Sequence, residues 1–209
     1  GLGDVSPRID VDNLSARLAS IEDRIHRSTR SLLENQNIRL IEGTGMLKGP
    51  NQVVAKTADG LEEIEADVVV LSTGSRPRIP DWAPVDGERI LTTREAYPPA
   101  EMPDHLIVVG SGVTGVEFVH MFKSFGCDVT LVVSRQQVLP QKDPEVAAAL
   151  EADFLRRGVR LFKGARAQSI ERDGGRVTVH CDDGRMATGS HVILAVGSVP
   201  NSEGLGLDT

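Results

Sequence analysis

The segment HLIVVGSGVTGVEF, residues 105–118, constrains the fold more than any other part of the chain. The apolar run LIVV suits a buried strand, and it leads through a glycine-rich turn into a helical pattern. Gly110, Gly112 and Gly115 have the G-x-G-x-x-G spacing. In such a turn the first glycine permits a tight bend, the second lets phosphates approach the backbone, and the third lets the helix pack on the strand.

A helix that starts behind such a turn offers free N–H groups and a partial positive charge to a pyrophosphate. We therefore predict a dinucleotide-binding site to which the whole turn contributes, including Ser111, Val113 and Thr114. The alternative is a glycine-rich turn that binds nothing. The preceding strand, the following helix and a second strand, DVTLVV, at a suitable distance favour the binding site.

The ribose-binding position departs from the usual pattern. A carboxylate about twenty residues after the turn normally holds the adenosine ribose hydroxyls. Here the strand DVTLVV ends at Ser134, and Arg135 follows. A hydroxyl and a guanidinium can instead hold a 2′-phosphate, so we expect the site to accept NADPH, with or without NADH. The alternative is that Arg135 is a solvated loop residue.

The two halves of the chain resemble each other. NIRLIEG at 37–43 matches GVRLFKG at 158–164, KTADG matches HCDDG, and VVLSTGSRP matches VILAVGSVP, in the same order and at nearly constant spacing. We interpret this as a duplication. The first copy lacks a counterpart of the glycine-rich turn and the strand before it.

Two helices and several strands are predicted around these motifs. Residues 14–35 form an amphipathic helix with one buried stripe, capped by Asn13. Asp143 and Pro144 open another helix that Gly158 ends, with Val146, Leu150 and Phe154 on its buried side. Strands are predicted from the apolar runs, which are IRLIEG, QVVAKTADG and ADVVVLSTG in the first half and VRLFKG, RVTVHCDDG and HVILAVG in the second.

The fold class predicted is α/β, with a Rossmann-like NAD(P)-binding domain that combines a parallel sheet with an antiparallel β-meander. Six of the eleven prolines lie between Pro77 and Pro103, where we expect a connection without regular strands or helices. We expect residues 1–90 to be an incomplete FAD-binding domain of the same type, 91–103 a proline-rich linker and 104–209 the NAD(P)-binding domain.

Composition excludes several kinds of function. The formal net charge of −7 and the few aromatic residues argue against nucleic-acid binding. No apolar run reaches the roughly 20 residues that a bilayer requires. Cys127 and Cys181 lie far apart and the five histidines lack ligand spacing, so we expect neither a disulfide framework nor a metal site. A reducing, cytoplasmic location is expected.

Together, LSTGSRP, the proline-rich connection, GSGVTGVEF and AVGSVPN resemble the FAD-dependent pyridine nucleotide–disulfide oxidoreductases over nearly the whole chain. PDHLIVVGSGVTGVEF and RGVRLFKGARA are most similar to the lipoamide-dehydrogenase-like branch that reduces quinones, and soluble pyridine nucleotide transhydrogenases come next. The resemblance implies that FAD and NAD(P) are cofactors and that the intact protein is a homodimer.

The resemblance also implies roles for single residues. Glu117 would lie near the nicotinamide and the flavin, and Val196 with Gly197 would lie along the nicotinamide side. For Glu117 the alternative is an exposed acid that the helix dipole favours.

For the flavin, the resemblance implies that Thr73 and Gly74 approach FAD and that Gly43, Thr44 and Gly45 meet its adenine. The alternative for all five residues is that they only form ordinary turns beside a strand and contact no flavin.

The implied activity is an oxidoreductase that passes hydride from NAD(P)H to FAD and on to a disulfide, a quinone or a second pyridine nucleotide. The family's N-terminal FAD-binding glycine motif, its CxxxxC pair and its C-terminal dimerisation domain are not found in this sequence. We therefore expect a fragment that binds NAD(P) without turnover, and we assign no catalytic residue. The alternative is a stand-alone NAD(P)-binding module without flavin chemistry.

Overall fold

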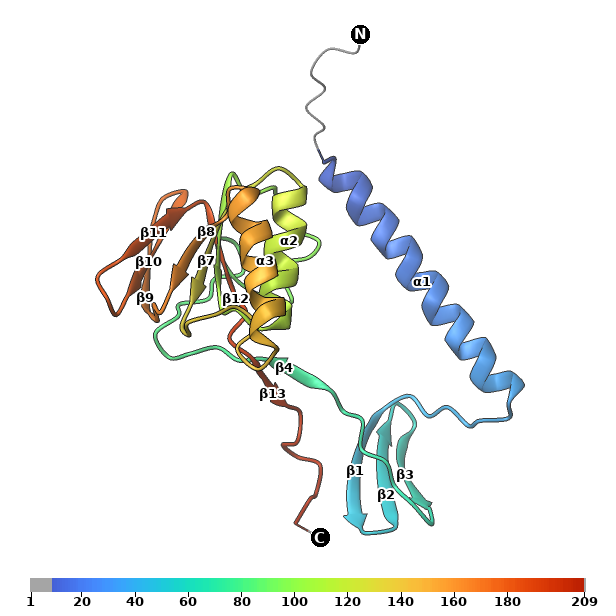
Figure 1. Cartoon of the computed structure of the whole chain (residues 1–209). Helices are drawn as coiled ribbons and strands as arrows, with labels where there is room; N and C mark the ends of the chain where they lie inside the picture. The colour runs from blue at the N-terminus through green and yellow to red at the C-terminus, as the bar shows by residue number, and fades with distance from the viewer. Residues whose placement is uncertain (1–8, 209) are drawn as a thin grey trace. The chain divides into compact units, whose positions relative to one another are not determined.

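The computed structural model describes residues 9–208, which divide into two compact units (Figure 1). Unit 1 combines residues 9–16 with Pro77–Ser198, and unit 2 combines Arg17–Arg76 with residues 199–208. The chain passes from one unit to the other three times. The first crossing lies within helix α1 (Val11–Asn35), and the other two lie in the short strands β4 (Ser75–Pro77) and β13 (Ser198–Pro200), which pair with each other. No helix within residues 9–208 is long and apolar enough to cross a membrane.

Unit 1 is built on a parallel sheet of five strands. Its strand order is β5 (Ile90–Thr92), β12 (His191–Leu194), β6 (His105–Val109), β7 (Asp128–Val133) and β8 (Arg160–Lys163). Helices α2 (Val113–Ser124) and α3 (Pro144–Arg156) lie together on one face, and a meander of β9 (Ala167–Asp173), β10 (Arg176–Cys181) and β11 (Met186–Gly189) lies on the other (Figure 1). The predicted α/β class, with a parallel sheet and an antiparallel meander, is confirmed.

The two faces of the sheet form two apolar layers. Along β6, Leu106 and Val108 belong to the helix-side cluster, whereas Ile107 and Val109 belong to the meander-side cluster. Successive side chains of a strand point to opposite faces, so a strand covered on both faces is apolar at most positions. This is why the central strands read as continuous apolar runs rather than as alternating patterns.

The signals at both ends of α3 act as predicted. Asp143 accepts hydrogen bonds from the amides of Glu145, at 2.8 Å, and Val146, while Pro144 opens the helix. At the other end Gly158 adopts φ +79°. One predicted position is wrong, because Val146 is 58% exposed. The buried side of α3 instead runs from Ala147 to Phe154.

Only one of the three strands predicted for the first half of the chain forms, as β2 (Gln52–Thr57), and other segments form its two neighbours. The meander of unit 2 consists of β1 (Thr44–Gly49), β2 and β3 (Gly60–Glu65), all antiparallel. The runs IRLIEG and ADVVVLSTG do not form strands, although both are rich in β-forming residues. A strand requires a hydrogen-bonded neighbour, and no strand within residues 9–208 pairs with either run.

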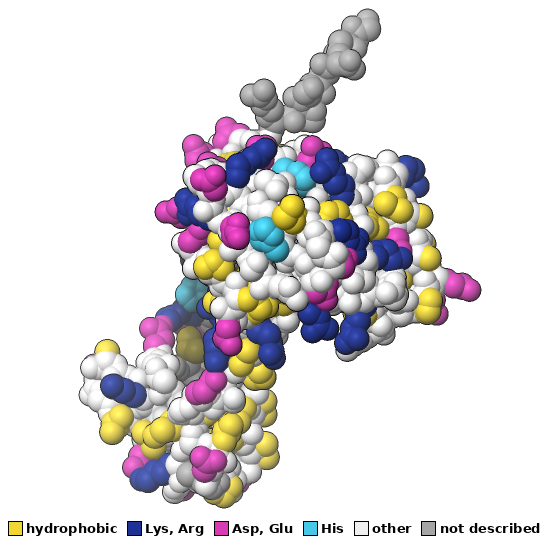
Figure 2. Space-filling model, turned by 90° about the vertical axis from the view of Figure 1, so that its left-hand side faces the viewer, with side chains coloured by type: hydrophobic (Ala, Val, Ile, Leu, Met, Phe, Trp, Pro, Cys, Tyr) yellow, Lys and Arg dark blue, Asp and Glu magenta, His cyan; other side chains and the backbone are white. Residues whose placement is uncertain are grey.

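The first helix, α1 (Val11–Asn35), forms as predicted but without a buried stripe. Ile25 and Leu32 are both more than half exposed. Its cap is also one turn earlier than predicted, because the side chain of Asp10 accepts the amide of Asn13 at 3.0 Å. Apolar side chains are exposed elsewhere in unit 2 too, among them Met46 and Leu61 of the meander, and Figure 2 shows hydrophobic side chains on its surface.

One pair of the matching segments, SRP and SVP, forms a two-stranded sheet. Each copy contributes a three-stranded meander, and the matching stretches SRP and SVP form β4 and β13. The amide of Asn201 donates to the carbonyl of Gly74 at one end of this pair, and the amide of Arg78 donates to Gly197 at the other. The proline-rich stretch contains one strand that we did not predict, β5, which lies in the proline-free interval between Pro84 and Pro98.

The buried side of α3 can be tested by two truncations on the same helix. Phe154→Ala removes a side chain that is fully buried, and we expect it to lower the free energy of unfolding by about 3–5 kcal/mol. Val146→Ala should change it by less than about 0.5 kcal/mol, because that side chain is exposed. Urea denaturation followed by circular dichroism measures both, and equal losses would contradict this assignment.

Candidate functional site

The glycine-rich turn joins the end of β6 to the start of α2 by direct contact between backbones. Gly110 adopts φ +110°, and a Cβ added there would overlap the carbonyl oxygen of Ala195, which follows β12. A Cβ added at Gly115 would overlap the carbonyl oxygen of Gly110 itself. Packing therefore requires both glycines. Gly110 is required by the tight turn, and Gly115 is required by the close approach of the helix.

Gly112 differs from its two neighbours in the motif. A Cβ added there would meet no heavy atom within 4 Å, and its backbone is not in the left-handed region. Packing within the described chain therefore gives no reason for a glycine at this position. An open approach to the backbone is what the second glycine provides for a phosphate group, so the residues present fit a dinucleotide.

The start of α2 leaves its N–H groups available. Gly112 is the N-cap and supplies no side-chain hydrogen bond, and the first helical bond runs from the amide of Val116 to Gly112. Val113 and Thr114 are exposed, whereas Ser111 is buried and its carbonyl accepts the amide of Leu139 at 2.7 Å. The free amides and the helix dipole favour an anion at this point.

The other residues predicted for the nucleotide lie around this turn. Gly110, Ser134 and Val196 line one cavity of about 270 Å³ at the carboxyl ends of the parallel strands. Gly197 follows Val196 and accepts the amide of Arg78 at 2.9 Å. Arg135 follows Ser134, and its side chain has no hydrogen-bond or ion-pair partner among residues 9–208. The structure thus brings these predicted positions together at one edge of the sheet.

Glu117 lies in the early part of α2 and is exposed. Its carboxylate makes no hydrogen bond or ion pair with the described part of the chain. The arrangement is compatible with both readings of this residue, and its place near a nicotinamide and a flavin stays a prediction.

Sequence reasoning missed one wall of the cavity. Pro80 and Trp82, from the proline-rich stretch, and Ala165 to Ala167, after β8, also line it. A turn in which the amide of Ala83 donates to Pro80 at 3.0 Å holds the first pair in place. No motif spacing connects residues 80–82 to the glycine-rich turn. The one signal in the sequence is that Trp82 is the single tryptophan.

The residues predicted for FAD all belong to unit 2, and several have structural roles there. A Cβ at Gly43 would overlap the carbonyl oxygen of Lys56, so strand pairing alone explains that glycine. The hydroxyl of Thr73 donates to the carbonyl of Asn201 at 2.7 Å. Gly74 adopts φ +71°. Thr44 and Gly45 begin β1 and are exposed. Contact of these residues with a flavin stays a prediction.

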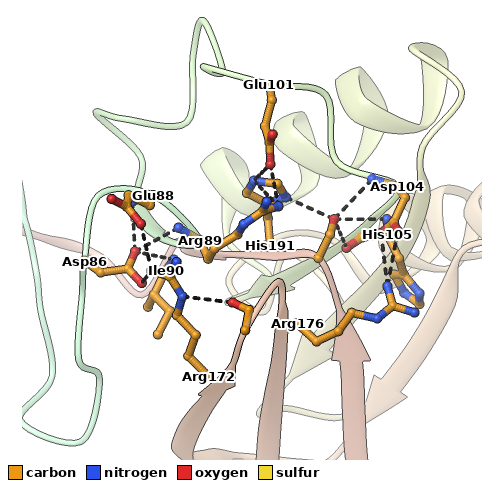
Figure 3. A network of polar contacts seen from close by, with 12 residues as sticks. Asp86, Glu88, Arg89, Ile90, Glu101, Asp104, His105, Arg172, Arg176 and His191 are labelled. Carbon is orange, nitrogen blue, oxygen red and sulfur yellow. Dashed lines mark hydrogen bonds and ion pairs between the residues drawn. The ribbon is translucent and has the colours of Figure 1, made fainter.

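A second polar cluster lies at the opposite, amino-terminal edge of the same sheet (Figure 3). His191, the first residue of β12, is buried, and its Nε2 lies 3.3 Å from the Glu101 carboxylate and 3.3 Å from the Arg89 guanidinium. Its Nδ1 lies 3.0 Å from the hydroxyl of Ser190. Arg89 and Glu101 pair at 2.5 Å. These contacts attach the proline-rich stretch to the sheet.

The charges of this cluster follow from their surroundings. Burial lowers the pKa of His191 and Arg89 lowers it further, against the opposing effect of Glu101. Burial raises the pKa of Asp86, but the amides of Ile90, Glu88 and Arg89 and the Arg172 guanidinium outweigh it and bring this pKa to about 2. Every partner is supplied by the chain itself, so we regard the cluster as structural. No group of three or more His, Cys, Asp or Glu within residues 9–208 is placed to hold a metal ion.

The buried histidine predicts how stability depends on pH. Because the pKa of His191 is lower in the folded chain than its ordinary 6.5, the unfolded chain binds the proton more readily. Its contribution is therefore complete above about pH 6.5 and is lost as the pH falls toward the folded pKa. We expect His191→Gln to reduce the loss of unfolding free energy between pH 7 and pH 5. The exposed His26→Gln is the control, and identical pH profiles for the two variants would refute the prediction.

Comparisons with known proteins agree with this geometry. A model of the pyridine nucleotide-disulphide oxidoreductases matches residues 6–209. A NAD(P)H dehydrogenase (quinone) of Mycobacterium tuberculosis is 44% identical over an alignment of 208 residues, which covers 96% of this chain and 42% of the relative. A dihydrolipoyl dehydrogenase of Zymomonas mobilis is 35% identical over 213 residues, covering 100% of this chain and 46% of the relative.

Solved structures give the same result. The crystal structure of LpdA from Mycobacterium tuberculosis matches with a TM-score of 0.87 at 44% identity, over 97% of this chain and 46% of that one. The flavoprotein disulfide reductase RclA from Escherichia coli, at 22% identity and a TM-score of 0.79, shares the fold. The chain thus spans less than half the length of these relatives. The resemblance inferred from its motifs is confirmed, and the chain belongs to the pyridine nucleotide-disulphide oxidoreductase family.

Proposed function

We propose that this chain is the nucleotide-binding part of a flavoprotein oxidoreductase, which passes hydride from NAD(P)H to FAD and on to a further acceptor. The observation that carries the proposal is the contrast within the glycine motif. Packing requires Gly110 and Gly115, whereas Gly112 faces open space in front of an uncapped helix start. That combination supports the binding of a dinucleotide pyrophosphate at the carboxyl edge of the sheet.

The flavin part of the proposal rests on the family and on its named relatives. FAD would supply the hydride-accepting chemistry, and this chain would bind and orient the nucleotide. The acceptor is a disulfide, a quinone or a second pyridine nucleotide. Two relatives bear the names NAD(P)H dehydrogenase (quinone) and dihydrolipoyl dehydrogenase, which support the first two of these classes.

The residues after β7 support acceptance of NADPH. Ser134 lines the cavity beside Gly110, and neither it nor Arg135 repels a phosphate as a carboxylate would. Arg135 is exposed and its guanidinium has no partner within residues 9–208, so it is available to a 2′-phosphate. The proposal therefore includes NADPH, with or without NADH, as the reductant.

Two further parts of the proposal concern the intact protein. A cytoplasmic, reducing location is supported by Cys127 and Cys181, which are buried, unpaired thiols. A homodimer is proposed from membership of the family.

Substitution of Gly112 tests the nucleotide site. Gly112→Ala should preserve stability, because a Cβ there meets nothing in the chain, and should weaken the binding of NADH and NADPH roughly tenfold or more by displacing the phosphates. Gly175→Ala, another glycine with open surroundings, is the matched control. Isothermal titration calorimetry measures the affinities. Unchanged affinity in a folded Gly112→Ala variant would refute the proposed site.

Substitution of Arg135 tests cofactor choice. Arg135→Ala should lower the affinity for NADPH by roughly tenfold and leave that for NADH unchanged, because only NADPH carries the 2′-phosphate that the guanidinium would pair with. Lys142→Ala removes a positive charge from the same connection between β7 and α3 and serves as the control. An equal effect of Arg135→Ala on the two nucleotides would refute the role of Arg135 in holding a 2′-phosphate.

A further inference from the structure

The cavity beside the glycine-rich turn has a volume of about 270 Å³ and a lining suited to a heterocyclic ring. Its floor is formed by apolar side chains at the ends of the central strands, and Pro80 and Trp82 form an apolar wall. Trp82 is half-buried and also packs against the meander-side core, so its position is fixed by that packing. Concave sites with mainly apolar walls and a few polar groups are typical of nucleotide and other small-molecule sites.

The charges at this cavity are of one sign. Arg78 and Arg166 line it together with Ser134, and no aspartate or glutamate does. Neither guanidinium has a hydrogen-bond or ion-pair partner among residues 9–208. Several arginines elsewhere in unit 1, among them Arg172 and Arg176, are paired with carboxylates, although Arg160 is not paired with any carboxylate of the described chain. In a chain with a net charge of −7, unpaired arginines gathered at one cavity suit an anionic ligand.

Backbone hydrogen bonds bring Arg166 beside the strand end that carries Ser134 and Arg135. The amide of Gly164 donates to the carbonyl of Arg135 at 3.0 Å, and the amide of Ala165 donates to Val133 at 3.1 Å. The amide of Arg166 is itself held by the Asp182 carboxylate at 2.9 Å. Two arginines from adjacent strand ends therefore flank the position where an adenosine ribose would lie.

We propose that this cavity receives the adenosine half of NADPH, with the adenine ring against Trp82 and the 2′-phosphate held by Arg166 together with Arg135. The inference rests on the proposed nucleotide site and adds two residues to it. An aromatic wall gives affinity to any adenine nucleotide, because a base stacks on it regardless of its substituents. The Arg166 guanidinium gives selectivity for NADPH over NADH, because only the 2′-phosphate forms charge-assisted hydrogen bonds that offset the desolvation of a second cation.

The first experiment measures the affinities of the full chain for NADPH, NADH and 2′,5′-ADP by calorimetry. Arg166→Ala should weaken the binding of NADPH and 2′,5′-ADP about tenfold and leave NADH within about twofold, whereas Arg166→Lys should lose less. Arg160→Ala removes the same charge at the opposite end of β8 and should change nothing. Circular dichroism confirms that each variant is folded.

The second experiment concerns the ring. Trp82→Ala should weaken both nucleotides about tenfold, and Trp82→Phe should retain most of the affinity because an aromatic face remains. In the wild type, 2′,5′-ADP should quench the emission of Trp82, the single tryptophan.

The outcomes separate this inference from the nucleotide site on which it rests. If NADH and NADPH bind and Gly112→Ala weakens both, but Arg166→Ala affects neither or affects both equally, the inference is wrong and the nucleotide site stands. The same holds if the wild type binds NADH but not 2′,5′-ADP, or if Trp82→Ala binds normally. If no nucleotide binds to the wild type, both are wrong.

Discussion

The close contact among three backbone segments determines the architecture of unit 1. The turn at Gly110 touches the carbonyl of Ala195, and the start of α2 at Gly115 touches the carbonyl of Gly110, in both cases without room for a side chain. Because α2 begins directly against the strand ends, its free amides point to the carboxyl edge of the sheet rather than into the core. The same contact fixes where β12 ends, so that Val196 lies next to the turn. A position that favours an anion is thus a direct consequence of how the sheet and the helix pack.

The sequence predicted those parts of the fold whose signals are local. The turn, both ends of α3 and the apolar central strands depend on residues within a few positions of each other, and the structure has them where they were expected. The runs IRLIEG and ADVVVLSTG have equally strong β propensity but lack a strand to pair with in the described chain. Propensity cannot supply a partner. Val146 was misplaced for a related reason, since helical spacing admits two neighbouring stripes and only packing selects the one through Ala147.

The candidate site shows the same division between local and distant information. Gly110, Gly112 and Gly115 follow a spacing rule, and Ser134 can be found by counting along the next strand. Trp82 and Arg166 cannot be found in this way, because one lies before the motif and the other lies after an intervening strand and helix. They reach the cavity only through the strand order of the sheet, which places the ends of β6, β7, β8 and β12 side by side. Side chains that complete a site from distant segments are therefore those that sequence spacing fails to predict.

The pairing of charges distinguishes the polar cluster at the amino-terminal edge of the sheet from the cavity at its carboxyl edge. At the amino-terminal edge, Arg89 pairs with Glu101, Arg172 with Asp86 and Arg176 with Asp104, so these three cations are satisfied by the chain and attach one segment to another (Figure 3). At the carboxyl edge, the guanidiniums of Arg78, Arg135 and Arg166 have no such partners within residues 9–208, and no carboxylate lines the cavity. Even a well-formed ion pair at the surface contributes little to stability. A ligand phosphate would give the unpaired guanidiniums at the cavity the partner that the described chain does not supply.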